Sequence, residues 1–368
     1  MICRFNSKLQ NTFKIDGFAY NKPLLIQWGG LYLTNINDKP YAEFSSPDQD
    51  IQKWVFVPDL VEENVFYIKT RSPKKYGESY LGAPNNDNIV YLYTSKTRFT
   101  RWKVVKSGSN VYNIDYIGEK HDIQKHTIII ARYNEETSWA LPYKDCVILY
   151  NKGKSATPLF NNVITLENIG REGDTYLRHI INNYDNLSDR VTFLQGDPLL
   201  HNETLLYGLD NYEKFDPFQN LGLRWLRTHN IPPIKIIEKH KIITKYKLHH
   251  LFVKINLDLE YIDDFSFFDP GIYALRDSYC RRFGRTEKII TGFLKRGGLD
   301  LIMPIDYVYF SFSALFSTTK TDICLHSKEI YEKLLKELLK YDNQGGTEGY
   351  ILERLWGFLL DNNSKVEF

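Results

Sequence analysis

A short apolar run that stops abruptly at polar residues constrains the fold of this chain more than any other feature. The run extends from Val191 to Leu194 and is followed by Gln195-Gly196-Asp197-Pro198. A run this short that is apolar on both faces is typical of a buried parallel strand. Pro198 has no amide hydrogen to donate to a neighbouring strand, so the strand must end before it. We therefore expect Asp197 at the carboxyl end of a buried strand, where open α/β sheets bind their ligands.

Asp197 has two interpretations at this stage. Its carboxylate, together with His201 four residues further on, could hold a divalent metal ion that in turn holds a phosphate group. Alternatively, Asp197 caps the next turn and His201 is an ordinary surface histidine. The stretch alone leaves both interpretations open, because short motifs also match by chance.

The composition predicts a packed globular protein. The chain has 368 residues, of which 43% are hydrophobic and 25% charged, and this length favours two or three domains. The formal net charge of +2 argues against general nucleic-acid binding. Aromatic residues reach 15%, which suits strand-rich structure.

Cysteine usage and hydropathy indicate the compartment. The four cysteines have no paired spacing, as expected for reduced thiols of a cytosolic protein. No apolar run has the length of a signal peptide or of a membrane span. We therefore expect a cytoplasmic protein without a membrane span.

The first third of the chain contains a repeat. Tyr32 and Tyr80 lie in similar Tyr-Leu segments that are 48 residues apart, and Trp54 and Trp102 repeat with the same offset. Each unit consists of short β runs separated by turn residues. A unit of this size cannot bury its own apolar face, so the copies must pack together. We expect both tryptophans to be buried packing residues.

The repeat resembles a lobe of a β-trefoil of the lectin, fascin or actin-crosslinker kind. Gln52-Lys53-Trp54 is similar to the Gln-x-Trp element of ricin-type lectins, and Val111–Tyr116 looks like the start of a third copy. The resemblance covers roughly residues 10 to 120 and implies an all-β, β-trefoil-like module at residues 1–122. This module could bind sugars or serve as a scaffold, and the sequence leaves both roles open.

Strands alternate with a helix after the polar break at residues 118–122. Strands are expected at 126–131, 146–150, 163–166 and 191–194, with a helix that opens near residue 170 and ends near 185. This alternation predicts a parallel α/β sheet with crossover connections. Further on, the patterns favour helices at 221–229, 327–341 and 347–360, a strand pair or loop at 234–256, and a strand-like run at 307–316.

Three polar clusters follow the predicted strands: Arg132–Glu135, Asn151–Gly153 and Gln195–Asp197. Because parallel strands point the same way, these clusters should meet at one edge of the sheet. A nucleotide fits such an edge, with its base and ribose at the first clusters and its diphosphate and a metal ion at Asp197. The expected helix start at Gly170-Arg171-Glu172 adds a positive helix terminus and one arginine.

The second region resembles the GT-A glycosyltransferases. Residues 128–136 are similar to their first strand, and Phe193–Pro198 lies where they carry an Asp-x-Asp metal motif. Four stretches also resemble a glycosyltransferase-like family of unknown function found in fungi, other eukaryotes and large DNA viruses. They are Arg132–Glu135 with Trp139, Asn168–Glu172 with Thr175–Leu177, Asn183–Leu187 through Phe193–Pro198, and Glu353–Trp356.

This resemblance implies a GT-A-like α/β domain with a Rossmann-like mixed sheet at residues 123–368. It implies a nucleotide-sugar donor, a glycan or protein hydroxyl as acceptor, and a virus-associated protein as one possible source. The strand-end clusters and the resemblance imply a donor site formed by Arg132, Tyr133, Asn134, Glu135, Arg171, Gln195 and Arg354.

One departure from the family pattern concerns the metal motif. Gln195-Gly196-Asp197 retains only the last carboxylate of Asp-x-Asp. In GT-A enzymes that last Asp is commonly a direct metal ligand, so the resemblance still implies Mn²⁺ or Mg²⁺ at Asp197. The spacing of His201 to Asp197 makes His201 the candidate for a second ligand. Diphosphate oxygens and waters would complete the coordination.

Sugar transfer also requires a base for the proton of the acceptor hydroxyl. Glu353, in Glu-Arg-Leu-Trp, is the first candidate and Glu348 the second. The alternative for Glu353 is an ion-paired or surface glutamate of a helix. For the whole protein we expect a metal-assisted glycosyltransferase. The alternative is a non-catalytic carbohydrate-binding or structural protein on a degenerate GT-A scaffold.

Overall fold

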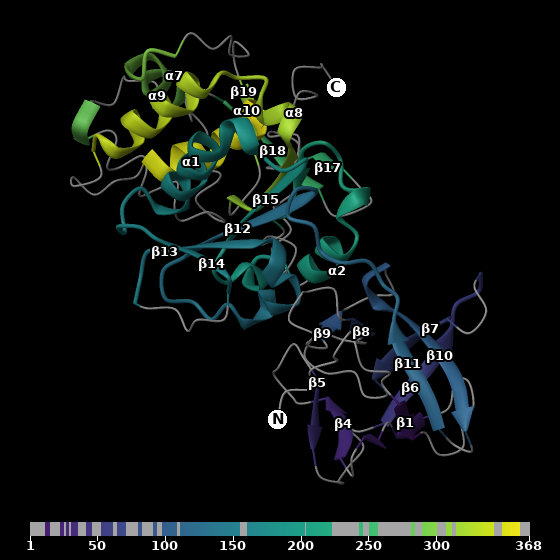
Figure 1. Cartoon of the computed structure of the whole chain (residues 1–368). Helices are drawn as coiled ribbons and strands as arrows, with labels where there is room; N and C mark the ends of the chain where they lie inside the picture. Colours follow the sequence, from purple (N-terminus) through teal and green to yellow (C-terminus); the bar gives the residue numbers. More distant parts are fainter. Residues whose placement is uncertain are drawn as a thin grey trace.

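The computed structural model contains a strand-rich amino-terminal region and an α/β region (Figure 1). It describes residues 12–14, 23–25, 27–28, 31–35, 42–45, 53–61, 65–70, 80–82, 91–93, 98–108, 111–154, 160–202, 204–222, 243–245, 250–256, 281–283, 289–299, 307–310, 314–341 and 348–360.

The described part of the amino-terminal region forms an eleven-stranded antiparallel sheet. Its strands are β1 (Thr12–Lys14), β2 (Pro23–Leu25), β3 (Gln27–Trp28), β4 (Leu31–Asn35), β5 (Ala42–Ser45), β6 (Lys53–Pro58), β7 (Val65–Thr70), β8 (Tyr80–Gly82), β9 (Tyr91–Tyr93), β10 (Arg101–Gly108) and β11 (Val111–Tyr116). The main order is β2-β6-β7-β10-β11-β1-β3-β4-β5, and β8 joins β7 to β9.

The strand pairing confirms the 48-residue repeat. Leu33 lies opposite Phe44 in the β4–β5 pair, and Leu81 lies opposite Leu92 in the β8–β9 pair. Each residue of the second pair follows its counterpart by 48 positions. The third expected copy differs, because β11 pairs with β10 and β1 instead of starting a further hairpin.

The two repeated tryptophans are both packing residues, as predicted. Trp54 is fully buried and Trp102 is 1% exposed. The Trp102 indole N–H donates a hydrogen bond to the Leu81 carbonyl at 2.8 Å, which satisfies its one polar atom. Neither side chain is therefore presented to solvent as a platform for a sugar ring.

The α/β region is built on a mixed sheet of six strands among the described residues. They are β12 (His126–Arg132), β13 (Val147–Asn151), β14 (Asn162–Thr165), β15 (Arg190–Gln195), β16 (Gln219–Asn220) and β20 (Phe316–Thr319). The order is β14-β13-β12-β15-β20-β16. The pairs β14–β13, β13–β12 and β12–β15 are parallel, which confirms the predicted parallel core. Strand β20 is antiparallel to β15, and β16 is antiparallel to β20.

The helices and shorter turns are the following: η2 (Arg98–Thr100), η3 (Ser138–Cys146), α1 (Arg171–Asn183), η4 (Tyr184–Asn186), η5 (Pro198–Leu200), α2 (Leu205–Asp210), η6 (Tyr212–Lys214), α7 (Ile289–Arg296), α8 (Lys320–Ile323), α9 (Lys328–Leu339) and α10 (Glu348–Leu360). Helices α1, α9 and α10 confirm the predictions for those stretches. Residues 221–222 are not helical, and the remainder of the predicted helix at 221–229 lies outside the described residues.

A small antiparallel sheet lies later in the chain. It contains β17 (Ile243–Lys245), β18 (His250–Asn256) and β19 (Tyr307–Phe310). The strand pair predicted within 234–256 is confirmed for its described residues. Strand β14 also lies where a strand was predicted, but all four of its residues are exposed because it forms the edge of the mixed sheet.

The side chains of the central strands alternate between two cores. Ile129 and Phe193 pack toward α1, α9 and α10, whereas Ile130 and Leu194 pack toward η3 and α2. This alternation follows from the two-residue period of a strand. Figure 1 shows α1, α9 and α10 on one side of the sheet and α2 on the other, with the amino-terminal region beyond α2. No helix in the described ranges is long and apolar enough to cross a membrane.

The amino-terminal region contributes to the second of these cores. Tyr93 and Phe99 belong to the same buried cluster as Ile130 and Leu194. The Tyr93 hydroxyl donates a hydrogen bond to the carbonyl of Pro142 in η3 at 2.7 Å. The two regions are therefore joined by a packed interface as well as by the chain.

Helix α1 carries a buried histidine. His179 is 3% exposed, and its Nδ1 lies 3.2 Å from the Tyr150 hydroxyl and 3.3 Å from the Asn183 side-chain amide nitrogen. Because an amide N–H only donates, Nδ1 accepts and the ring proton lies on Nε2. Burial lowers the pKa of His179 from 6.5 to about 4.

This histidine predicts acid sensitivity of the fold. The unfolded chain binds the proton near pH 6.5 and the folded chain only near pH 4. Stability from this group is therefore complete above pH 6.5 and is lost as the pH falls through that window, by roughly 2–3 kcal/mol near its lower end. Urea unfolding at pH 7.5 and pH 4.5 should show this loss in the wild type. It should be largely absent in His179→Gln, and an equal pH dependence of the two proteins would contradict the prediction.

Candidate functional site

The three polar clusters meet at one edge of the mixed sheet, as predicted. In the strand register, Ala131 lies beside Gln195 and Arg132 beside Asn151. The chain segments that follow these strands touch one another. A Cβ atom on Gly153 would lie 1.4 Å from the Tyr133 carbonyl oxygen, so only glycine permits this approach.

The guanidinium of Arg132 holds two of these segments together. Its Nε donates to the Glu135 carbonyl at 2.9 Å, and one terminal nitrogen donates to Asn151 Oδ1 at 2.6 Å and to the Lys154 carbonyl at 3.0 Å. Arg132 was predicted to bind the donor. The structure places Arg132 at the expected edge, but most of its N–H groups donate hydrogen bonds to other groups of the protein.

Glu135 closes the turn after β12. Its carboxylate accepts hydrogen bonds from the amides of Tyr133 at 2.6 Å and Asn134 at 3.1 Å. It also packs against Gly196, whose added Cβ would lie 2.6 Å from Glu135 Oε2. The Trp139 indole donates to the Gly196 carbonyl at 2.9 Å. Glu135 therefore joins the end of β12 to the end of β15.

Two of the predicted donor-binding residues, Tyr133 and Asn134, are exposed to solvent at this edge. The Tyr133 side chain is 50% exposed. Asn134 is also exposed, and its Oδ1 accepts from the Lys154 amide at 3.0 Å. An aromatic ring that is half-exposed at the carboxyl edge of a parallel sheet is suited to stacking against a planar group.

A buried lysine connects the sheet to α1. Lys152 Nζ donates to the carbonyls of Ile169 at 2.6 Å and Arg171 at 2.7 Å, and it pairs with Asp174 at 2.7 Å. Burial lowers the pKa of Lys152, and the charge of Asp174 opposes that shift. Arg178 pairs with the other oxygen of the same carboxylate at 2.6 Å. Lys152 thus fixes the start of α1 against the end of β13.

The turn into α1 has an unusual backbone. Gly170 has φ 60° and Arg171 has φ 52°, so two consecutive residues are left-handed and the second has a side chain. The Arg171 side chain is exposed, and its guanidinium carbon lies 4.6 Å from the centre of the Tyr350 ring. Arg171 is therefore a cation held at the helix start by a contact with α10, close to the sheet edge.

Glu172 follows directly and lies against β15. Its carboxylate accepts a hydrogen bond from the Gln195 side chain, and burial raises its pKa. The charges of Arg171 and Lys152, together with the bond from Gln195, oppose that rise. Glu172 keeps an intermediate exposed surface, although protein atoms enclose most of its carboxylate.

Helix α10 holds the two glutamates that the sequence suggested as bases. Glu348 is fully buried and pairs with Arg282 at 2.7 Å. Glu353 is 9% exposed and lies 3.3 Å from Arg354, which is fully buried and donates to the Tyr350 carbonyl at 2.6 Å. Both glutamates are ion-paired, and Arg354 lies inside the protein instead of at the edge.

Asp197 and His201 flank the short helical turn η5. Asp197 is partly exposed and stands at the N-cap position, but its side chain makes no capping hydrogen bond. The His201 amide donates to the Pro198 carbonyl at 3.0 Å. In the described ranges, no group of three or more His, Cys, Asp or Glu side chains is arranged to hold a metal ion. The structure therefore supports neither a capping role for the Asp197 side chain nor a metal site made by protein ligands alone.

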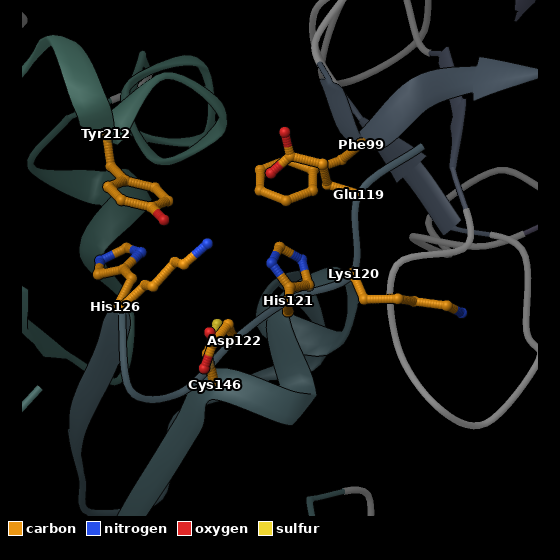
Figure 2. A pocket seen from close by; sticks show the side chains of 9 residues that line it. Phe99, Glu119, Lys120, His121, Asp122, His126, Cys146 and Tyr212 are labelled. Atoms are coloured by element: carbon orange, nitrogen blue, oxygen red, sulfur yellow. The ribbon is translucent and has the colours of Figure 1, made fainter. Parts of the chain in front are cut away.

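A small pocket lies at the opposite end of the strands. It is lined by Phe99, Glu119, Lys120, His121, Asp122, Lys125, His126, Cys146 and Tyr212, and its volume is about 20 Å³, enough for about one water molecule. Figure 2 shows His126 and Tyr212 facing Phe99 and His121 across it. His126 begins β12 whereas Arg132 ends it, so this pocket belongs to the joint between the two regions and not to the candidate site.

Sequence reasoning did not identify Lys152 or Asp174, and it did not assign a role to Glu172. The signal for Lys152 was its place between Asn151 and Gly153 in a strand-end cluster. Its burial could not be anticipated, because lysine is almost never buried unless it is paired. Glu172 was marked by its place in the first turn of the predicted helix and by the Asn168–Glu172 stretch of the family resemblance.

One protein family matches this part of the chain. A family described as "Protein of unknown function (DUF3431)" matches residues 128–227. The matched segment runs from β12 past β16 and includes the three strand-end clusters and the start of α1, but not α10. No curated protein matches the chain.

The buried lysine gives a stability prediction. Lys152→Ala should lower the free energy of unfolding by about 3–5 kcal/mol, because it removes one partner from a carboxylate that is 1% exposed. Arg178→Ala is the matched control, since it removes the 33% exposed partner of the same carboxylate and should cost about 1 kcal/mol or less. Urea unfolding at pH 7.5 measures both, and similar small losses would refute the anchoring role of Lys152.

Proposed function

We propose that the α/β region is a GT-A-like glycosyltransferase domain. It moves a sugar from a nucleotide-diphosphate sugar to a hydroxyl group of a glycan or protein acceptor. The observation that carries the proposal is the convergence of the ends of β12, β13 and β15 with the start of α1 at one sheet edge. This is where open α/β folds bind nucleotides.

The exposed groups at this edge suit a nucleotide diphosphate. The half-exposed Tyr133 ring offers a stacking surface for the base, and Asn134 offers hydrogen-bonding atoms beside it. Arg171 offers an exposed guanidinium at a helix amino terminus, and both features favour phosphate oxygens. In this proposal Tyr133, Asn134 and Arg171 contact the donor. Three further residues support the site through contacts within the protein: Arg132, Glu135 and Arg354.

In this proposal a metal ion would need ligands from the donor as well as from the protein, because the described residues include no group of three or more His, Cys, Asp or Glu side chains that could hold one. Asp197 and His201 would be the protein ligands, and a carboxylate oxygen is of the kind that Mn²⁺ and Mg²⁺ prefer. Diphosphate oxygens would have to supply further ligands. When bound, such an ion would stabilise the charge of the leaving diphosphate.

A non-catalytic carbohydrate-binding or structural protein is the second candidate. It is favoured by the bonds that commit Arg132 and Glu135 to the protein itself. For the strand-rich region we propose a β-trefoil-like module, supported by the two repeat copies with matching register. A scaffold role fits this module better than sugar binding through its tryptophans, because Trp54 and Trp102 are buried.

The role of Asp197 can be measured by calorimetry of uridine and guanosine diphosphates with Mn²⁺ and with chelator. We expect Asp197→Asn to keep the fold and to weaken Mn²⁺-dependent binding about tenfold to a hundredfold, because one charged ligand is lost. Asp189→Asn is the control, since Asp189 is an exposed residue at the opposite end of β15.

The outcomes separate the two candidates. Binding that is metal-independent and equal in wild type and Asp197→Asn would leave a nucleotide site in which Asp197 has no metal role. If wild-type protein bound neither diphosphate with or without Mn²⁺, the glycosyltransferase proposal would fail in favour of the non-catalytic candidate.

A further inference from the structure

One edge of the mixed sheet is exposed and has no partner strand among the described residues. Strand β14 is the last strand on that side, and all four of its residues are exposed. The edge on the other side differs, because both residues of β16 are buried. An uncovered edge strand carries backbone N–H and C=O groups that can pair with another strand. Within the described part of the chain, β14 is therefore an open edge.

The pairing of β14 with β13 shows which of its backbone groups point outward. The Leu166 amide donates to the Asn151 carbonyl at 2.9 Å, so Leu166 faces β13. The N–H and C=O groups of one residue point to the same side of a strand, and that side alternates along the chain. Ile164 therefore also faces β13, whereas the backbone groups of Val163 and Thr165 point away from the sheet. A further strand would pair with these outward groups.

The exposed side chains of β14 suit an apolar partner strand. Val163 and Ile164 are each 41% exposed. Val163 lies beside Leu149 and Ile164 beside Tyr150 in the strand register. Leu149 and Tyr150 belong to the two cores on opposite faces of the sheet. A further strand would therefore extend the apolar surface on both faces of the sheet.

The sequence of this edge favours a second copy of the same chain as the partner. Residues 161–166 include no charged residue, and the strand has no Lys, Pro or bulge of the kind that commonly protects an edge. In an antiparallel pair of two copies centred on Ile164, Val163 lies opposite Thr165 of the second copy, so outward groups meet outward groups. Glu167, the first charged residue beyond the run, then lies opposite an uncharged asparagine. Two copies can thus pair without like charges directly opposite each other.

We propose that the protein forms a two-fold symmetric dimer through β14, in which the mixed sheets of two copies join into one continuous sheet. Backbone hydrogen bonds link Val163 of each copy to Thr165 of the other, and the two Ile164 side chains meet at the symmetry axis. A strand of four residues buries less than the area of about 1,000 Å² that a stable interface needs, so the dimer is weak and depends on concentration. The dimer is independent of the proposed function, because it uses only the flank of the sheet.

Sedimentation velocity of the full chain measures the association. Between about 5 and 500 µM, a range suited to a small interface, the wild type should change from monomer to dimer. Ile164→Lys places two like charges opposite each other at the axis, so it should weaken the dimer by about tenfold or more. Leu325→Lys is the matched control, because Leu325 is 45% exposed and follows α8. Helix α8 packs against β20, which β13, β12 and β15 separate from β14, so this variant should dimerise like the wild type.

Disulfide trapping tests the register of the pair. Residues that face each other without hydrogen bonds have Cα atoms about 4.5 Å apart, which suits a disulfide, whereas diagonal neighbours are about 7–8 Å apart. Under mild oxidation with copper–phenanthroline in air, Ile164→Cys should therefore form a disulfide-linked dimer. Val163→Cys is equally exposed but diagonal to its counterpart, so it should not. Wild-type protein in the same oxidant controls for the four native cysteines.

Each result decides the proposal. A wild type that stays monomeric over the whole concentration range overturns it. A dimer that Ile164→Lys leaves unchanged also overturns it, since the association would then use another surface. Equal trapping of Ile164→Cys and Val163→Cys, or trapping of neither, overturns the antiparallel pairing. The two cysteine variants still decide the question if Ile164→Lys fails to fold.

Discussion

The buried contact of Lys152 with Asp174 is the interaction on which the candidate site depends. The lysine follows β13, and its ammonium also donates to the carbonyls of Ile169, just before α1, and Arg171, the first residue of α1. Removing both charges from water is costly, and a well-packed apolar pair would often be as stable. Unlike an apolar contact, Lys152 makes three directed bonds, to two carbonyls and to the Asp174 carboxylate, and these fix the start of α1 in one position. The left-handed backbone of Gly170 and Arg171 is held by this arrangement.

That turn directs the side chains of two neighbouring charged residues, Arg171 and Glu172, to different surroundings. Arg171 projects outward and rests on Tyr350, which keeps a cation at the sheet edge without burying it. Glu172 instead turns toward β15 and meets Gln195. The segment after β13 passes close to the backbone of Tyr133 because Gly153 has no side chain, and the Glu135 side chain packs against Gly196. The geometry of this edge therefore depends on a buried ion pair, a strained turn, one close backbone approach and one side chain packed on a glycine.

Sequence reasoning predicted the parallel strands, the edge where they end and the 48-residue repeat, because each has a local signal: an apolar run, a polar stop or a recurring pair of residues. It could not predict the burial of Glu348 and Arg354. Their surroundings depend on the packing of α10 against α1 and on a pairing with Arg282, which is distant in the sequence. The apolar residues of β14 suggested an ordinary strand, but its edge position leaves them exposed. Local patterns thus predicted the edge at which the parallel strands end, whereas long-range packing determined which charged side chains near it are buried.

The position of the strand-rich region bears on access to the candidate edge. Tyr93 and Phe99 pack into the core on the face of the sheet opposite α1, and the pocket at this joint lies at the first residue of β12. The candidate edge lies at the other end of the strands, where Arg132 ends β12 and Gln195 ends β15. A donor bound there, as proposed, would therefore lie away from the interface between the two regions. Among the described residues, the strand-rich region packs against the α/β region at the end of the strands opposite to that edge.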